Sequence, residues 1–179
     1  MINLIDAHGG SLKELIAPDS EKLSIKSNAI NYPSITLNDR QLCDLELLMN
    51  GAFSPLAGFL NKKDYQSVVA HMRLSDETLW PMPVTLDISQ NQHESIKEHA
   101  NIALRDEEGI LLAVLEIENI WEPDKLVEAK NVFGTVDTKH SAVDYLLNTS
   151  GDIYVGGKIH GLEYPKHYDY QLLRHTPAE

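Results

Sequence analysis

The sequence contains a single cysteine, Cys43, so no disulfide can form within the chain. A chain with so little cysteine is typical of reducing compartments, and we predict a cytoplasmic protein. Cys43 lies within an apolar helical pattern. This position predicts a small buried side chain rather than a reactive thiol.

Basic residues are also scarce. The chain has 15 Lys and Arg against 27 Asp and Glu, for a formal net charge of -12, and no run of basic residues offsets this balance. Nucleic-acid binding relies on cationic side chains that neutralise phosphates, so we predict no nucleic-acid partner.

Long apolar runs are missing as well. No stretch approaches the ~18 uninterrupted apolar residues of a membrane-spanning helix. We therefore predict no membrane-spanning helix and no membrane among the partners. The first ten residues lack a basic region followed by an apolar core, so they do not resemble a signal peptide. A chain of 179 residues is long enough for one domain that needs no metal or disulfide to fold.

Helix signals occur in several stretches. Asn38 or Asp39 can cap a helix with an apolar face of Leu42, Leu45, Leu48 and Met49, and Asn50-Gly51 supplies a left-handed stop. Ser11 and Glu14 have the spacing of a capping box and predict another helix from that point. Further helices are predicted from Asn61, over 122–134 and over 141–148.

Strand signals alternate with these helices. Residues 22–27 and 34–38 are short candidates, and 101–121 resembles a β-hairpin that turns at Gly109. Residues 80–89 predict an edge strand because Pro81 and Pro83 cannot donate to a ladder. Residues 152–162 predict a late strand interrupted at Gly156-Gly157. The mixture, without regular βαβ alternation, favours an α+β fold with a mixed or antiparallel sheet, or a small barrel.

We find no convincing catalytic constellation. The eight histidines form no H-E-x-x-H pattern, and His93 and His99 lie in a polar stretch that predicts exposure to solvent. "HGGS" at 8–11 and "YVGGK" at 154–158 could bind an anion, but turns are the favoured interpretation. Thr135, Asp137 and the three residues after it could form an acid/base cluster, but the favoured interpretation is that Asp137 or Thr138 begins a helix and the other residues are exposed. We therefore predict no catalytic, substrate-binding or metal-binding residue.

Several long blocks nevertheless resemble one enzyme family. These are "AHGGSLKEL", "RQLCDLELLMNGAFSPLAGFL", "DYQSVVAHMRL", "LWPMPVTLDI", "VFGTVDTKHSAVDYLL", "DIYVGGKIHGL" and "LRHTPAE". Their order is similar to that of ATP sulfurylase (sulfate adenylyltransferase), and the resemblance covers essentially the whole chain. Ala7, Glu77 and Ser141 depart from the family's usual proline, glycine and proline, all at turn positions.

The resemblance implies the N-terminal part of a larger enzyme. Residues 1–170 would form a PUA-like mixed β-barrel with short flanking helices, and 171–179 would begin the linker to a catalytic domain. The family's Gln-Thr-Arg-Asn-Pro segment and His-x-x-His pair are not present in this sequence. The parent would use MgATP in the ATP-binding reaction of sulfate assimilation, and family members are commonly homo-oligomers. No cofactor is expected in this stretch.

The parent reaction joins sulfate to the α-phosphate of ATP, which demands cationic and backbone donors that relieve charge. An acidic chain is poorly supplied with such donors, so we expect a scaffold or docking role. The apolar loop 52–60 would be costly if fully wet. We expect Leu56 and Leu60 to pack inward. We expect either Phe53 or Phe59 to be partly exposed. The candidate interdomain docking residues are Arg40, Asp44, Phe53 and Phe59.

Two alternatives remain open. PUA-like folds elsewhere bind RNA, so the chain could be a free-standing RNA-binding module, although its charge opposes this. Residual anion binding is the other alternative, at His8-Gly9-Gly10 or at Gly156-Gly157-Lys158.

Overall fold

The computed structural model describes residues 5–179. Contacts divide the chain into two compact units, each built from separate stretches of sequence. Unit 1 comprises the residues up to Gly58, His99–Glu116 and Lys158–Glu179. Unit 2 comprises Phe59–Glu98 and Ile117–Gly157.

The strands pair in the order β1-β3-β4-β5-β2. The parallel pairing of β1 with β3 and the antiparallel pairings of β3 with β4 and of β2 with β5 make the sheet mixed, which confirms the α+β class. The bounds are β1 Ser34–Thr36, β2 Leu86–Ile88, β3 Asn101–Arg105, β4 Leu111–Trp121 and β5 Ile153–Gly161.

Unit 1 contains two helices, α1 (Asp19–Ala29) and α2 (Asp39–Met49). Helix α2 begins and ends as predicted. The side chain of Asn38 accepts a hydrogen bond from the backbone N–H of Gln41, whose own side chain returns the bond, and Gly51 follows the helix with a φ of 85°. The buried stripe of α2 and the inward residues of β1 and β3 form the core of unit 1, with Ile35, Leu45, Leu48, Ile102 and Leu104 among its least exposed members.

Two predictions for unit 1 are wrong. Residues 11–16 form no helix, because their backbone bonds to other segments: the N–H of Leu15 donates to Met49 O, and its carbonyl accepts from Gly161 N. Residues 22–27 are helical within α1 rather than a strand. Pro18 precedes this helix, acidic residues occupy its first turn, and Leu23 is exposed, so a buried alternating face never forms.

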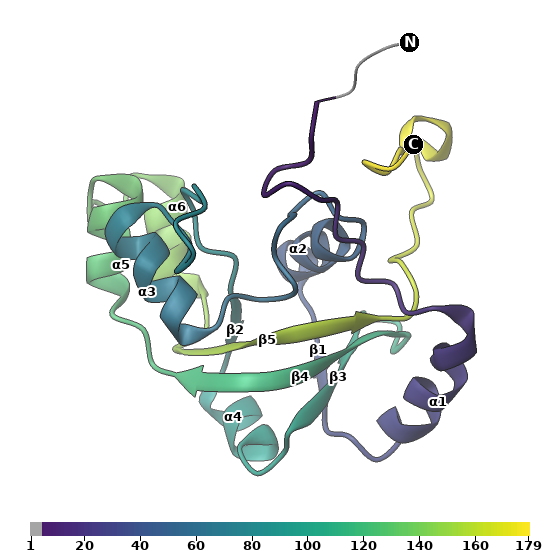
Figure 1. Ribbon diagram of the computed structural model, residues 1–179. Coiled ribbons are helices and arrows are strands. Elements are labelled where there is room, and N and C mark those ends of the chain that lie inside the picture. The colour runs from purple at the N-terminus through teal and green to yellow at the C-terminus, as the bar shows by residue number, and fades with distance from the viewer. Residues whose placement is uncertain (1–4) are drawn as a thin grey trace. The chain divides into compact units, whose positions relative to one another are not determined.

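Unit 2 contains four helices among its described residues, and α3, α5 and α6 lie side by side in Figure 1. The predicted start of α3 is confirmed, with the side chain of Asn61 as its cap. The helix predicted over 122–134 is α5, which begins later than predicted, at Lys125, and is capped by Asp124. A π-helical turn, Tyr145–Thr149, extends α6. The bounds are α3 Lys62–His71, α4 Gln90–Ile96, α5 Lys125–Phe133 and α6 Ser141–Asp144.

The predicted hairpin over 101–121 is confirmed, with Gly109 at a φ of 84° in its turn. The predicted edge strand is also confirmed, but it is short. Only Leu86–Ile88 pairs, as the outermost strand in the order, because Pro81 and Pro83 lack the N–H groups that a longer ladder needs.

Strand β5 runs through Gly156-Gly157 without the predicted interruption. The N–H of Gly157 donates to the carbonyl of Phe59 at 3.0 Å, and a Cβ on Gly156 would collide with the carbonyl of Leu60. These glycines therefore mark a place where another backbone segment crosses the strand closely, not a turn.

Candidate functional site

The loop 52–58 of unit 1 is fixed by buried polar contacts at its start. The buried hydroxyl of Ser54 donates to Gly51 O at 2.6 Å and accepts from the N–H of Lys13 at 2.8 Å. The Ser54-Pro55 peptide bond is cis. A Cβ on Gly9 would lie 2.7 Å from Pro55 Cβ, so the glycine turn at 8–10 allows the N-terminal segment to pass against the loop.

The burial expected for this apolar stretch is confirmed. Leu56 in unit 1 and Leu60 in unit 2 are buried, and one of the two phenylalanines, Phe53, is partly exposed. The other, Phe59, is 2% exposed, so its ring is not available at the surface. Of the two rings, Phe53 is therefore the one that a docked domain could contact.

Arg40 and Asp44 lie one turn apart on α2. Their side chains form an ion pair with 2.6 Å between Arg40 Nη1 and Asp44 Oδ2. Such a partly exposed i,i+4 pair contributes on the order of 0.3–0.5 kcal/mol to the helix. The pair orients two charged side chains on the part of α2 that precedes the loop.

Cys43 is exposed, which contradicts the buried position predicted for it. The buried positions of α2 include Gln41, Leu45, Leu48 and Met49. Cys43 is two residues from both Gln41 and Leu45, and a rotation of about 100° per residue turns it away from that face.

The other sequence candidates are not brought together into a site. "HGGS" forms a turn closed by Gly10 N and Ala7 O, as the favoured interpretation predicted. Asp137–His140 are exposed, with Asp137 bonded to its own loop, and α6 begins only after His140. "YVGGK" lies in β5 rather than in the predicted turn.

The histidines also separate. His99 is exposed as predicted, but His93 is half-buried and its Nδ1 is buried with no hydrogen-bond partner in the structure. Within residues 5–179, no group of three or more His, Cys, Asp and Glu side chains could hold a metal ion. No helix in the same range has the length and apolar character needed to cross a membrane.

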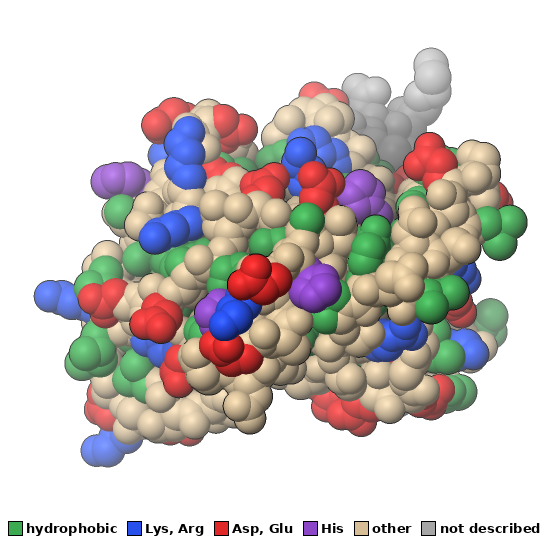
Figure 2. Space-filling model, turned by 90° about the horizontal axis from the view of Figure 1, so that it is seen from below, with side chains coloured by type: hydrophobic (Ala, Val, Ile, Leu, Met, Phe, Trp, Pro, Cys, Tyr) green, Lys and Arg blue, Asp and Glu red, His purple; other side chains and the backbone are tan. Residues whose placement is uncertain are grey.

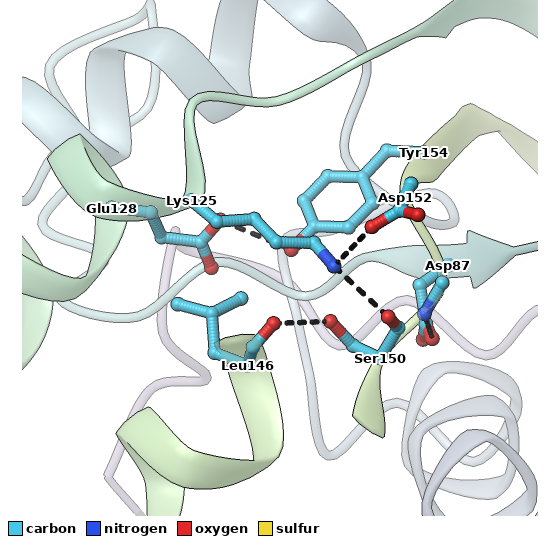
Figure 3. Close-up of polar contacts among 8 residues, drawn as sticks. Asp87, Lys125, Glu128, Leu146, Ser150, Asp152 and Tyr154 are labelled. Carbon is cyan, nitrogen blue, oxygen red and sulfur yellow. Dashed lines mark hydrogen bonds and ion pairs between the residues drawn. The ribbon is translucent and has the colours of Figure 1, made fainter. Parts of the chain in front are cut away.

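Sequence reasoning missed a buried polar cluster in unit 2, part of which Figure 3 shows. Glu128 of α5 is buried, and its Oε2 accepts hydrogen bonds from the phenols of Tyr65 at 2.9 Å and Tyr154 at 3.1 Å. Trp121 packs on both rings, with centroids 5.5 Å from Tyr65 and 5.9 Å from Tyr154. The signal that could have indicated this cluster is the position of Glu128 next to Ala129, on the buried face of the short helix α5.

Burial, and then the carboxylate of Glu128, raises the pKa of both tyrosines well above the ordinary range. Tyr65 and Tyr154 are therefore neutral donors at physiological pH. The cluster joins three elements, α3, α5 and β5, through one carboxylate.

A second set of polar contacts lies beside this cluster (Figure 3). Lys125 Nζ donates to Ser150 O at 2.9 Å and to Asp152 Oδ1 at 2.8 Å, while the buried Asp87 accepts from Gly151 N at 2.7 Å. These bonds hold the segment between the π-helical turn and β5. Because the carboxylate of Glu128 and the phenols of Tyr65 and Tyr154 are bonded to one another, we assign these three side chains a structural role.

Comparison with known proteins identifies the class. The model of the PUA-like domain family matches residues 5–164, and the chain belongs to this family. The fold class predicted from the sequence is thereby confirmed.

Particular relatives are sulfate adenylyltransferases, which confirms the resemblance found in the sequence. The chain is 49% identical to the enzyme of Phaeosphaeria nodorum, over 96% of this chain and 31% of that protein. It is 46% identical to the enzyme of Saccharomyces cerevisiae, over 96% of this chain and 34% of that one. The chain thus spans about a third of the length of these relatives.

A solved structure agrees. A hexameric APS kinase from Thiobacillus denitrificans superimposes with a TM-score of 0.77 and 32% sequence identity, covering 98% of this chain and 30% of that one.

Proposed function

We propose that this chain is the PUA-like part of a sulfate adenylyltransferase and supports a catalytic domain of the same protein. The parent reaction would convert MgATP and sulfate to adenylyl sulfate and pyrophosphate. The observation that carries the proposal is the 46–49% identity to two such enzymes over almost the whole chain, which spans only about a third of each. The domain would end near residue 170, and 171–179 would begin the connection to the catalytic domain. Residues 1–4, which belong to the predicted PUA-like domain over 1–170, lie outside the described residues.

Electrostatics support a role without catalysis. Adenylyl transfer requires cationic and backbone donors directed at developing negative charge. Several described cations are instead paired with carboxylates, as in Arg40 with Asp44 and Lys125 with Asp152. On the face in Figure 2, Lys and Arg side chains are scattered among Asp and Glu rather than gathered in one patch.

The docking surface would centre on Arg40, Asp44 and Phe53. Phe53 offers a partly exposed ring to the catalytic domain. The Arg40–Asp44 ion pair on the preceding helix, α2, offers charged groups for polar contacts. Phe59 would act indirectly, as a buried anchor of the stretch that follows the loop. The parent would be a cytoplasmic homo-oligomer, a proposal supported by the hexameric state of the structural neighbour.

A domain exchange tests the proposal. The matching third of the Saccharomyces cerevisiae enzyme is replaced by this chain, and sulfate-dependent pyrophosphate release is measured. We expect activity from the chimaera and none from the 179-residue chain alone. Sulfate-dependent turnover by the chain alone would overturn the supporting role. Tight, salt-sensitive retention of RNA in filter binding would instead favour the RNA-binding alternative.

The docking residues have their own test within the chimaera. Phe53→Ser is expected to lower the activity or the melting temperature of the chimaera by more than it lowers the melting temperature of the isolated chain. Leu126→Ser is the matched control, since Leu126 is an exposed apolar residue of unit 2. Equal behaviour of the two chimaeras would remove Phe53 from the docking surface.

A further inference from the structure

A hollow of about 350 Å³ lies on unit 2, between α3, α5 and the end of β4. This volume is within the range of sites that hold a small ligand or one or two side chains of a partner. Its lining includes Tyr65 and Val69 of α3, Trp121 at the end of β4, Glu122 and Asp124 after that strand, and Val127 of α5.

Apolar side chains form one part of the wall of the hollow, and polar side chains form the rest. Val69 and Ala70 come from α3, Val127 comes from α5, and Val127 is 47% exposed although it is a large apolar side chain. The aromatic rings of Tyr65 and Trp121 belong to the same apolar part of the wall. An apolar surface of this kind favours an occupant with apolar side chains.

The rim of the hollow is acidic. Glu122 and Asp124 are both exposed, and Lys62 is the one cationic side chain among the lining residues. Burial is the main cause of the raised pKa of Tyr65, and the carboxylates of Glu128 and Asp124 raise this pKa further. The wall formed by Tyr65 therefore lies near negative charge. A cation near aromatic rings and carboxylates is stabilised by both.

The indole of Trp121 supplies a separate observation. Trp121 lines the hollow, yet its Nε1 is buried and has no hydrogen-bond partner in the structure. Buried polar groups are rarely left unpaired, because such a donor loses its bond to water without replacement. A backbone carbonyl of a bound segment, admitted by a small movement of the indole, would satisfy this N–H.

We propose that the hollow binds a short peptide segment of a partner protein that carries an Arg or Lys beside an apolar side chain. The apolar side chain packs on Val69, Ala70 and Val127, and the basic group lies between Glu122 and Asp124. A carbonyl of the segment accepts from Trp121 Nε1. This site is separate from the docking surface proposed on unit 1 and does not depend on it.

The test follows the indole N–H resonance of Trp121 in ¹⁵N-labelled chain. The probe is the synthetic peptide acetyl-Gly-Leu-Arg-Leu-Gly-amide, and the control peptide has Glu in place of Arg. The basic peptide is expected to shift the Trp121 resonance downfield in a saturable manner, while the Trp80 resonance stays in place. The acidic peptide is expected to bind at least tenfold more weakly.

A charge variant supplies the matched control. Glu122→Gln combined with Asp124→Asn keeps a capping side chain at 124 and removes both rim charges. This double variant should weaken the basic peptide at least fivefold, whereas Glu107→Gln with Glu108→Gln, two acidic residues of unit 1, should not. The proposal is overturned if the Trp121 resonance does not respond up to millimolar peptide. It is also overturned if both peptides bind equally, or if sedimentation shows that the hollow is closed by a second copy of the chain.

Discussion

The phenol of Tyr154 donates a hydrogen bond of 3.1 Å to Oε2 of Glu128, and the two residues are 26 positions apart in the chain. The same oxygen accepts from Tyr65, so one buried carboxylate connects α3, α5 and β5. Loss of any member leaves the others buried without their partner, which is more costly than the net value of a hydrogen bond.

Removing one phenol should therefore destabilise the chain measurably. We expect Tyr154→Phe to lower the free energy of unfolding by about 2 kcal/mol, since hydrogen bonds to charged groups contribute on the order of 1.5–3 kcal/mol. Urea denaturation followed by circular dichroism measures this change. Tyr168→Phe, at an exposed tyrosine, is the control and should change stability by less than about 0.5 kcal/mol. A small loss for Tyr154→Phe, equal to that of the control, would show that the bond does not support the fold.

The raised tyrosine pKa values predict a loss of stability in alkali. A folded-state pKa above the unfolded value of about 10 means that the unfolded chain releases the proton first, so stability is complete below pH 10 and falls above it. The slope should be about -1.4 kcal/mol per pH unit for each of Tyr65 and Tyr154. Urea denaturation at pH 9, 10 and 11 measures it, and Tyr154→Phe should show a shallower decline. Identical slopes in the two proteins would contradict the shifted pKa.

The crossing at Gly156 predicts a severe effect of a single methyl group. Gly156→Ala places a Cβ against the carbonyl of Leu60, where backbone must move, and we expect a loss of about 3 kcal/mol. Thermal denaturation measures this loss. Gly134→Ala is the comparison, because its Cβ meets open space and only the positive φ opposes it, at a cost of about 1 kcal/mol. Should Gly156→Ala be the milder change, the close approach is not present in solution.

The exposure of Cys43 predicts a thiol that reacts in the native protein. Ellman's reagent should titrate one thiol per chain without denaturant, and Cys43→Ser should abolish the signal. If the thiol reacts only in urea, Cys43 is buried in the native protein, as the sequence predicted, and the exposed position is wrong.

Local signals in the sequence predicted both ends of α2 and the starts of α3 and α6, whereas α1 and α4 were not predicted. Asn38 and Asn61 cap helices, and Gly51 takes the positive φ that follows α2, because each signal depends on residues within a few positions. The failures at 11–16 and 22–27 have a different origin. Residues 11–16 take their hydrogen bonds from distant segments, which no local pattern reveals.

The same distinction applies to function. The docking candidates came from a local apolar run and a helical charge pair, so sequence reasoning could name them. Glu128, by contrast, meets Tyr65 across 63 positions and Tyr154 across 26. The hollow likewise joins α3 to residues that follow β4, so neither feature has a contiguous motif that could be searched for.

Neither unit is a continuous piece of polypeptide: unit 1 is assembled from three stretches and unit 2 from two. A deletion from either terminus can therefore shorten unit 1 but cannot free unit 2 as an intact body. A gene encoding unit 2 alone would have to rejoin Glu98 to Ile117 with a new linker. Recombination between homologues should be tolerated best when crossovers come in pairs that bracket a complete insert, such as those after Glu98 and after Glu116, which enclose the stretch of unit 1 that interrupts unit 2.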